Sequence, residues 1–182
     1  MKQFYGSIKK IYVQEILVQK ARQFSDLVIP TIDYSDSEQH QISKIKEDHF
    51  ISKLGEEAAR LVLQDYADVK GPDYEVYEAK KKNWNADLFV NNKGVAVKTQ
   101  KTSAAKKYSL SWTFQSGPKR RDIILDKPES WIIFVEYDDV NLHLCHVYPP
   151  FQIKELEFKY PRLPHLQNHK LVVYASTLKI QT

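Results

Sequence analysis

Residues 85–100 read NADLFVNNKGVAVKTQ, and this stretch constrains the fold more than any other part of the sequence. Two short apolar runs, ADLFV and VAVKT, flank the residues Asn-Asn-Lys-Gly. Because Asn and Gly tolerate the left-handed backbone of tight turns, the pattern predicts two antiparallel strands joined by a hairpin turn. Asp87 heads the first strand, and Lys98 lies in the second beside Val95 and Val97.

Lys98 needs a partner if it belongs to an apolar strand. Burying an ammonium group without compensation is energetically costly, so such a lysine is uncommon. Asp87 is the candidate partner, since antiparallel pairing brings the two positions together. A carboxylate and a lysine that meet at a strand edge have the chemistry to hold Mg²⁺ and a phosphate group.

Charge is distributed unevenly along the chain. The net charge is only +4, yet residues 80–121 contain eleven Lys or Arg residues and one acidic residue, Asp87. Such a local excess favours a polyanionic partner such as a nucleic acid. A solvated, lysine-rich surface is the alternative interpretation.

Length and composition set the class of protein. At 182 residues and 42% hydrophobic content, the chain predicts a single globular domain with a substantial core. No window approaches the roughly 18–20 apolar residues of a membrane span. The single cysteine, Cys145, excludes an internal disulfide and suits a reducing compartment, so we expect a cytoplasmic protein without membrane contact.

Hydrophobic periodicity predicts further elements around the hairpin. Residues 8–24 are expected to form an amphipathic helix, residues 25–40 a loop, and residues 42–66 a second helix. Residues 74–79 alternate and predict the first strand of a three-stranded meander, with residues 80–83 as the turn into the hairpin. The remaining expectations are strands at residues 109–114, with Trp112 in the core, and at 131–137, 142–148 and 171–180, and a short helix at 151–158.

Some of these residues resemble the PD-(D/E)XK nuclease superfamily, which includes restriction endonucleases and Holliday-junction resolvases. The segment Gly55-Glu56-x-x-Ala59-x-x-x-Leu63 is similar to the helix that opens small resolvase-like members. Asp87-Leu88 followed by VAVKTQ resembles their signature, an aspartate and a hydrophobic residue followed later by Glu-Val-Lys-Thr. The spacing of eleven from Asp87 to Lys98 is typical of that signature, and the resemblance covers residues 55–112.

The resemblance implies an α/β fold with a restriction-endonuclease-like central mixed β-sheet flanked by helices. Residues 42–148 would form the catalytic core and residues 149–182 a C-terminal extension. Residues 1–41 would form an N-terminal helical arm, either packed on the core or used for dimerisation. The implied activity is Mg²⁺-dependent hydrolysis of DNA phosphodiesters, with Mn²⁺ as a substitute metal. A homodimeric, type II-like restriction endonuclease acting on double-stranded DNA is the first choice.

The chain departs from the signature at one position. The family's second acidic residue lies two positions before the lysine, where this chain has Ala96. Glu56 or Glu57 on the helix would supply the missing carboxylate, and the family spacing favours Glu56 whereas the helical wheel favours Glu57. Gln100 lies on the same strand face as Lys98 and is another oxygen donor. The alternatives are a non-catalytic DNA-binding module, a repair or recombination nuclease, and an RNA-processing or RNA-binding protein.

The resemblance also assigns roles to the site residues. Asp87 and a helix glutamate would bind the metal with the Val97 carbonyl, since Mg²⁺ prefers hard oxygen ligands. Lys98 would orient or deprotonate the attacking water, or stabilise the developing negative charge. Basic residues that follow the hairpin are expected to contact DNA phosphates; they are Lys101, Lys106, Lys107 and, in an exposed turn, Lys119, Arg120 and Arg121.

Overall fold

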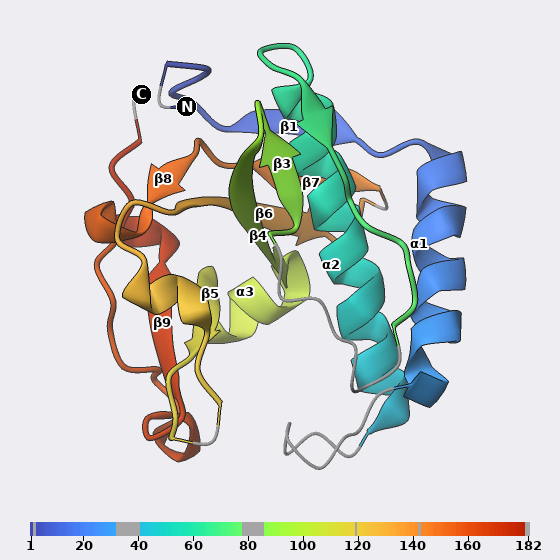
Figure 1. Ribbon diagram of the computed structural model, residues 1–182. Coiled ribbons are helices and arrows are strands. Elements are labelled where there is room, and N and C mark those ends of the chain that lie inside the picture. The colour runs from blue at the N-terminus through green and yellow to red at the C-terminus, as the bar shows by residue number, and fades with distance from the viewer. Residues whose placement is uncertain (2, 32–40, 78–85, 119, 142, 181–182) are drawn as a thin grey trace.

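The computed structural model describes residues 1, 3–31, 41–77, 86–118, 120–141 and 143–180 (Figure 1). The α-helices in these ranges are α1 (Glu15–Val28), α2 (Ile42–Leu63) and α3 (Thr102–Tyr108). The main sheet contains β1 (Lys9–Tyr12), β2 (Val69–Lys70), β3 (Leu88–Val90), β4 (Lys93–Lys101), β6 (Trp131–Asp138), β7 (Leu144–Val147) and β8 (Phe151–Gln152). A small sheet contains β5 (Ser111–Gln115) and β9 (Lys170–Tyr174).

The main sheet is mixed. Its strand order is β1-β7-β6-β4-β3-β2, and β8 pairs with the start of β6. β4 and β6 run parallel, whereas the other described neighbours are antiparallel. A parallel pair needs a crossover connection, which here includes α3 and β5. The arrangement confirms the predicted α/β class with a central mixed sheet.

The hairpin at the centre of the sequence forms as predicted. β3 and β4 are antiparallel neighbours, and Leu88 pairs with Val95. The turn between them consists of Asn91 and Asn92, which adopt positive φ angles of 47° and 62°. This left-handed conformation is the one that two-residue hairpin turns require and that Asn tolerates. Lys93 and Gly94, expected in the turn, are instead the first two residues of β4.

The two faces of the main sheet pack against different layers. Val95 and Val97 of β4 belong to a buried cluster with α2 and α1, whereas Ala96 packs in a second cluster with Trp112 and Phe134. Figure 1 shows α2 lying across the sheet, with α1 beside it and the small sheet on the side away from α1. The alternation along β4 therefore divides the interior into two cores.

Trp112 has the core position that we expected. It is 2% exposed, and its ring stacks on Phe134 with centroids 4.5 Å apart. Its Nε1 donates a hydrogen bond to the Val135 carbonyl at 2.9 Å. Because the buried indole N–H is satisfied, Trp112 fixes the small sheet to β6.

Gly55 allows α2 to approach β4 closely. A Cβ atom at this position would lie 1.8 Å from Thr99 Oγ1 and 2.9 Å from Thr99 Cβ. No side chain larger than hydrogen fits there unless the helix moves away from the strand. The next residue on α2, Glu56, is 3% exposed.

The prediction for the N-terminal region was partly wrong. Residues 9–12 form β1, which pairs with β7, and the helix begins only at Glu15. Exposed and half-buried residues alternate along β1, as in a strand. The helical spacing of apolar residues across the longer segment 8–24 outweighed this short alternation in the prediction. The helix also continues to Val28, into the segment expected to be a loop. The rest of that loop, residues 32–40, lies outside the described residues.

Three other expectations were wrong in the described chain. The strand expected at residues 171–180 ends at Tyr174, and Ala175–Thr177 form a 3-10 turn. Residues 74–77 form no strand, and β2 replaces them as the first strand of the meander. The residues 78–83 of the same prediction lie outside the described residues. Residues 151–158 contain β8 and the 3-10 turn Ile153–Glu155 in place of a helix. Helix α3 was not predicted; the Asp139 carboxylate accepts hydrogen bonds from the N–H and hydroxyl of Ser103 at its start.

Candidate active site

Asp87 lies directly before β3 begins. Its Oδ2 accepts a hydrogen bond from the Val97 N–H of β4 at 2.7 Å, so the carboxylate replaces a backbone acceptor beyond the start of β3. Burial raises the pKa of Asp87; the Val97 N–H and the ammonium groups of Lys53 and Lys98 oppose this rise, and the charge of Asp122 adds to it. Asp87 is therefore a partly buried carboxylate anchored to the strand that carries Lys98.

Glu56 lies on α2 and is 3% exposed. Its carboxylate accepts hydrogen bonds from Lys53 Nζ at 2.6 Å and from Ser52 Oγ at 3.2 Å. Burial and, next in size, the negative charge of Asp87 raise the pKa of Glu56 to about 7, although Lys53 and Ser52 oppose the rise. The helix carboxylate of Glu56 is thus within electrostatic reach of Asp87.

Glu57 has different neighbours. Its carboxylate accepts hydrogen bonds from Arg60 Nε at 2.6 Å and from the Tyr74 hydroxyl at 3.0 Å. These contacts attach the segment that contains Tyr74 to α2, which explains why that segment does not join the sheet. Glu56 is hydrogen-bonded to neither of these residues, and the charge of Asp87 raises the pKa of Glu56.

Lys98 forms its hydrogen bond with a residue that the sequence did not single out. Its Nζ donates to Asp122 Oδ2 at 2.9 Å and lies 4.6 Å from the centroid of the Phe114 ring. The same Oδ2 accepts the Gln115 N–H at 3.2 Å. Asp87 was the expected partner, and this part of the prediction was wrong; the structure places Asp87 close enough to interact with the Lys98 charge, but the ion pair is with Asp122.

The two remaining ligand candidates on β4 differ in availability. The side-chain oxygen of Gln100 accepts the Ser111 N–H at 2.8 Å, so it is used in fixing the start of β5. The Val97 N–H points to Asp87. Because the N–H and C=O groups of one strand residue point to the same side, the Val97 carbonyl faces the same edge.

The donor set suits a metal that keeps several waters. Within the described ranges, no three His, Cys, Asp or Glu side chains are grouped to hold a metal ion. Mg²⁺ usually binds through one or two carboxylates, waters and substrate phosphates. Glu56, Asp87 and the Val97 carbonyl match this donor set. Burial is the main cause of the raised pKa of both carboxylates, and a divalent cation would favour their charged forms.

The predicted DNA-binding residues are scattered over three elements. Lys106 and Lys107 are exposed on α3, and Arg120 is exposed after β5. Lys101 Nζ donates to Glu47 Oε1 at 2.8 Å, and Arg121 forms an exposed ion pair with Asp126 at 2.8 Å. Lys119 lies outside the described residues.

Sequence reasoning missed two charged residues of the site. Lys53 was not singled out, because its ion pair with Glu56 depends on the two residues lying three positions apart on one helix. Asp122 is the first acidic residue after the basic segment 80–121, which was the available signal. Its contact with Lys98, 24 residues away, arises only from the tertiary fold.

No protein-family model, curated protein or solved structure matches this chain. In the part of the chain that the structure describes, none of the helices combines the length and apolar character needed to cross a membrane. Conclusions about function therefore depend on the chemistry of the site.

Proposed function

We propose that this protein is a Mg²⁺-dependent DNA endonuclease, with Glu56 and Asp87 as the carboxylate ligands of the metal. The observation that carries the proposal is the carboxylate of Glu56, which is 3% exposed on α2 and on which the charge of Asp87 acts, while Asp87 itself is fixed before β3 by the Val97 N–H. Two like charges brought out of water are costly without a compensating cation. Such an arrangement is typical of functional sites.

Glu56 supplies the acid that the strand lacks at Ala96. The bound metal would acidify a water molecule and neutralise charge on the phosphoryl group. The chain's own residues hold the surrounding geometry: Asp87 is fixed by the Val97 N–H, and Glu56 is fixed by Ser52 and Lys53.

Lys98 is the proposed general base or electrostatic catalyst. Lys98 follows Val97 on β4, and the Val97 N–H binds Asp87. The positive charge of Lys98 opposes the rise in the pKa of Asp87. Asp122 holds the ammonium on the opposite side from α2, over the Phe114 ring. A lysine positioned in this way can orient water or stabilise negative charge on a phosphate oxygen.

A type II-like restriction endonuclease acting as a homodimer is our preferred form of the activity, because cutting both strands usually requires two active sites. The small sheet and the basic turn after β5 provide material outside the site that can contact bases. A repair or recombination nuclease is the alternative within the same chemistry. Cleavage of matched duplex, branched and single-stranded substrates distinguishes these forms.

A non-catalytic DNA-binding module is the second candidate function. It is favoured by one observation: Ala96 packs its methyl group in the cluster around Phe134, so β4 contributes no carboxylate beside Lys98. Such a protein would bind DNA but would not cleave it with any divalent metal.

Cleavage of supercoiled plasmid in Mg²⁺, Mn²⁺ and EDTA tests the proposal. We expect nicked and linear products with either metal and none in EDTA. Glu56→Gln and Asp87→Asn each remove a charged ligand while keeping the side-chain shape. Stabilisation of charge by a metal is worth several kcal/mol, and each ~1.4 kcal/mol is tenfold in rate, so both variants should lose at least about a hundredfold in rate.

Glu129→Gln is the matched control, because Glu129 is exposed and paired with Lys154. It should cleave like the wild type. Full activity of both Glu56→Gln and Asp87→Asn would disprove the assignment of ligands. DNA binding without cleavage by the wild-type protein would favour the second candidate.

A further inference from the structure

Lys170 of the small sheet is connected to the proposed site through a short series of contacts. Lys170 pairs with Gln115 across β5 and β9. The Gln115 N–H donates to Asp122 Oδ2 at 3.2 Å, and the same oxygen accepts Lys98 Nζ at 2.9 Å. The small sheet therefore presents a lysine next to the elements that hold Lys98.

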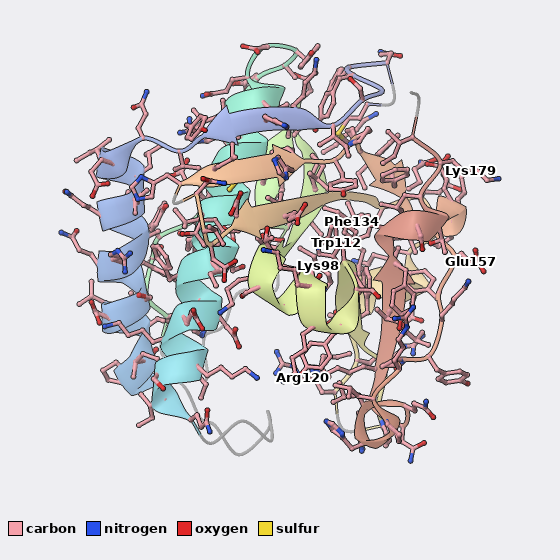
Figure 2. The ribbon with its side chains drawn as sticks, turned by 180° about the vertical axis from the view of Figure 1, so that it is seen from behind. Lys98, Trp112, Arg120, Phe134, Glu157 and Lys179 are labelled. Carbon is pink, nitrogen blue, oxygen red and sulfur yellow. The ribbon has the colours of Figure 1, made fainter. Side chains whose placement is uncertain are left out.

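Arg120 is held on the same side. Ser116 pairs with Arg121 in an isolated bridge, and the Ser116 N–H donates to the His169 carbonyl at 2.9 Å. Gly117 is also packed on His169, where an added Cβ would lie 3.2 Å from the ring Nδ1. These contacts attach the basic turn to the start of β9. Figure 2 shows the labelled Arg120 in the region between α2 and the small sheet, below the labelled Lys98 in this view.

The first turns of α2 contribute a further lysine, Lys44. The ion pair between Glu47 and Lys101, at 2.8 Å, holds this end of the helix against the end of β4. Burial lowers the pKa of Lys170, and the charges of Lys44, Lys98 and Arg120 lower it further, opposed by Asp48. Cations from α2, β4 and the turn after β5 therefore act on Lys170 of β9.

Like charges in one place destabilise a fold unless something compensates them. The acidic neighbours do this only in part, since Glu47 is paired with Lys101 and Asp122 with Lys98. Desolvation raises the pKa of Asp48 above its ordinary value, although the charges of Lys44, Lys101 and Lys170 oppose the rise. A polyanion would compensate the excess, and a DNA backbone is the polyanion that the adjacent site would act on.

We propose that Lys44, Arg120 and Lys170 form a phosphate-binding surface that holds the DNA backbone as it passes towards Lys98 and Asp87. The identity of the polyanion rests on the proposed function. Two of these residues, Lys44 and Lys170, lie outside the basic segment 80–121 from which DNA contacts were predicted. The surface is built by the fold, because it combines α2, the turn after β5, and β9.

The test compares two double variants that remove the same charge. Lys44→Gln with Lys170→Gln alters the surface. Lys154→Gln with Lys179→Gln alters Lys154, which is exposed and paired with Glu129, and Lys179, which Figure 2 labels away from Arg120. Anisotropy of a short fluorescein-labelled DNA duplex is measured in EDTA over a series of KCl concentrations. The slope of log K against log salt should become shallower by about 0.9 for each lysine in the first variant and stay unchanged in the second.

Equal slopes in the two double variants would overturn the proposal, as would tighter binding of an RNA duplex of the same length. Thermal unfolding without DNA gives an independent check on Lys170→Gln. Removing a half-buried ammonium among like charges should raise the melting temperature, and a clear decrease would show that Lys170 has a structural role instead. DNA binding is measured in EDTA, where no cleavage is expected. The measured slopes therefore test the phosphate-binding surface whether or not the plasmid assay shows cleavage.

Discussion

A carboxylate buried among apolar residues costs free energy unless hydrogen bonds, cations or a proton compensate it. Glu56 and Asp87 are compensated only in part, by Lys53 and by the Val97 N–H respectively. In the metal-free protein, Lys53 thus supplies some of the positive charge that a divalent ion would supply more fully. The alanine at position 96 limits the number of like charges in this space, which is consistent with a site whose second acid comes from the helix.

Glu56 predicts how the stability of the metal-free protein changes with pH. Its pKa rises from 4.5 to about 7 on folding, so its contribution to stability is fully present below pH 4.5 and is lost as the pH rises through about 7. The loss amounts to roughly 3 kcal/mol at 1.36 kcal/mol per pKa unit. The glutamine in Glu56→Gln cannot ionise, so this variant should not show the loss of stability.

Urea denaturation in EDTA, below and above this pH range, measures the effect. The free energy of unfolding of the wild type relative to Glu56→Gln should fall as the pH rises. A difference that does not change with pH would mean that Glu56 titrates near its ordinary pKa and is not desolvated in solution.

At the scale of elements, the packing of α2 on β4 creates the site. Gly55 faces Thr99 at a distance that leaves no room for a Cβ atom, and Glu56 follows immediately. The segment Gly-Glu could be recognised in the sequence because both residues belong to one helix. The closeness of the helix to the strand could not, since it depends on the pairing of β4 with its two neighbours.

Gly55→Ala tests whether Gly55 is needed for the packing of α2 on β4 or only lowers the stability of the helix. In an exposed helix interior, Ala stabilises relative to Gly by about 1 kcal/mol. Here the added methyl group collides with Thr99, so we expect a loss of about 1–3 kcal/mol in the free energy of unfolding, as for other overpacked cores. Combining it with Thr99→Ala should restore part of the loss, because Oγ1 and Cγ2 are removed. A more stable single variant would show that the helix tolerates a side chain there.

The elements that sequence predicted correctly are those with local causes. The turn of the hairpin consists of Asn91 and Asn92, and its strands alternate within the same stretch, so no distant residue is needed to recognise it. β1 is a strand because β7, more than 130 residues later, pairs with it. Tyr74 lies outside the sheet, where its hydroxyl binds Glu57 of α2. Neither cause is visible in the local pattern.

At the scale of the whole molecule, the same distinction applies to the candidate site. Glu56, Asp87 and Lys98 could be chosen from one continuous third of the chain. The ion pair between Lys98 and Asp122 and the approach of Lys170 require the small sheet, whose two strands lie more than fifty residues apart in sequence. The fold thus adds a second, basic layer around residues that the sequence indicated.

The most direct test of the proposed site is calorimetric titration of the DNA-free protein with Mn²⁺ near pH 7, in two buffers of different ionisation enthalpy. We predict saturable binding with release of protons, because Glu56 is partly protonated near its pKa of about 7 and must ionise to bind a metal. Glu56→Gln and Asp87→Asn should each abolish this binding, and Glu129→Gln should retain it. Absence of saturable binding by the wild type, or unchanged binding by both variants, would contradict the assignment of Glu56 and Asp87 as metal ligands.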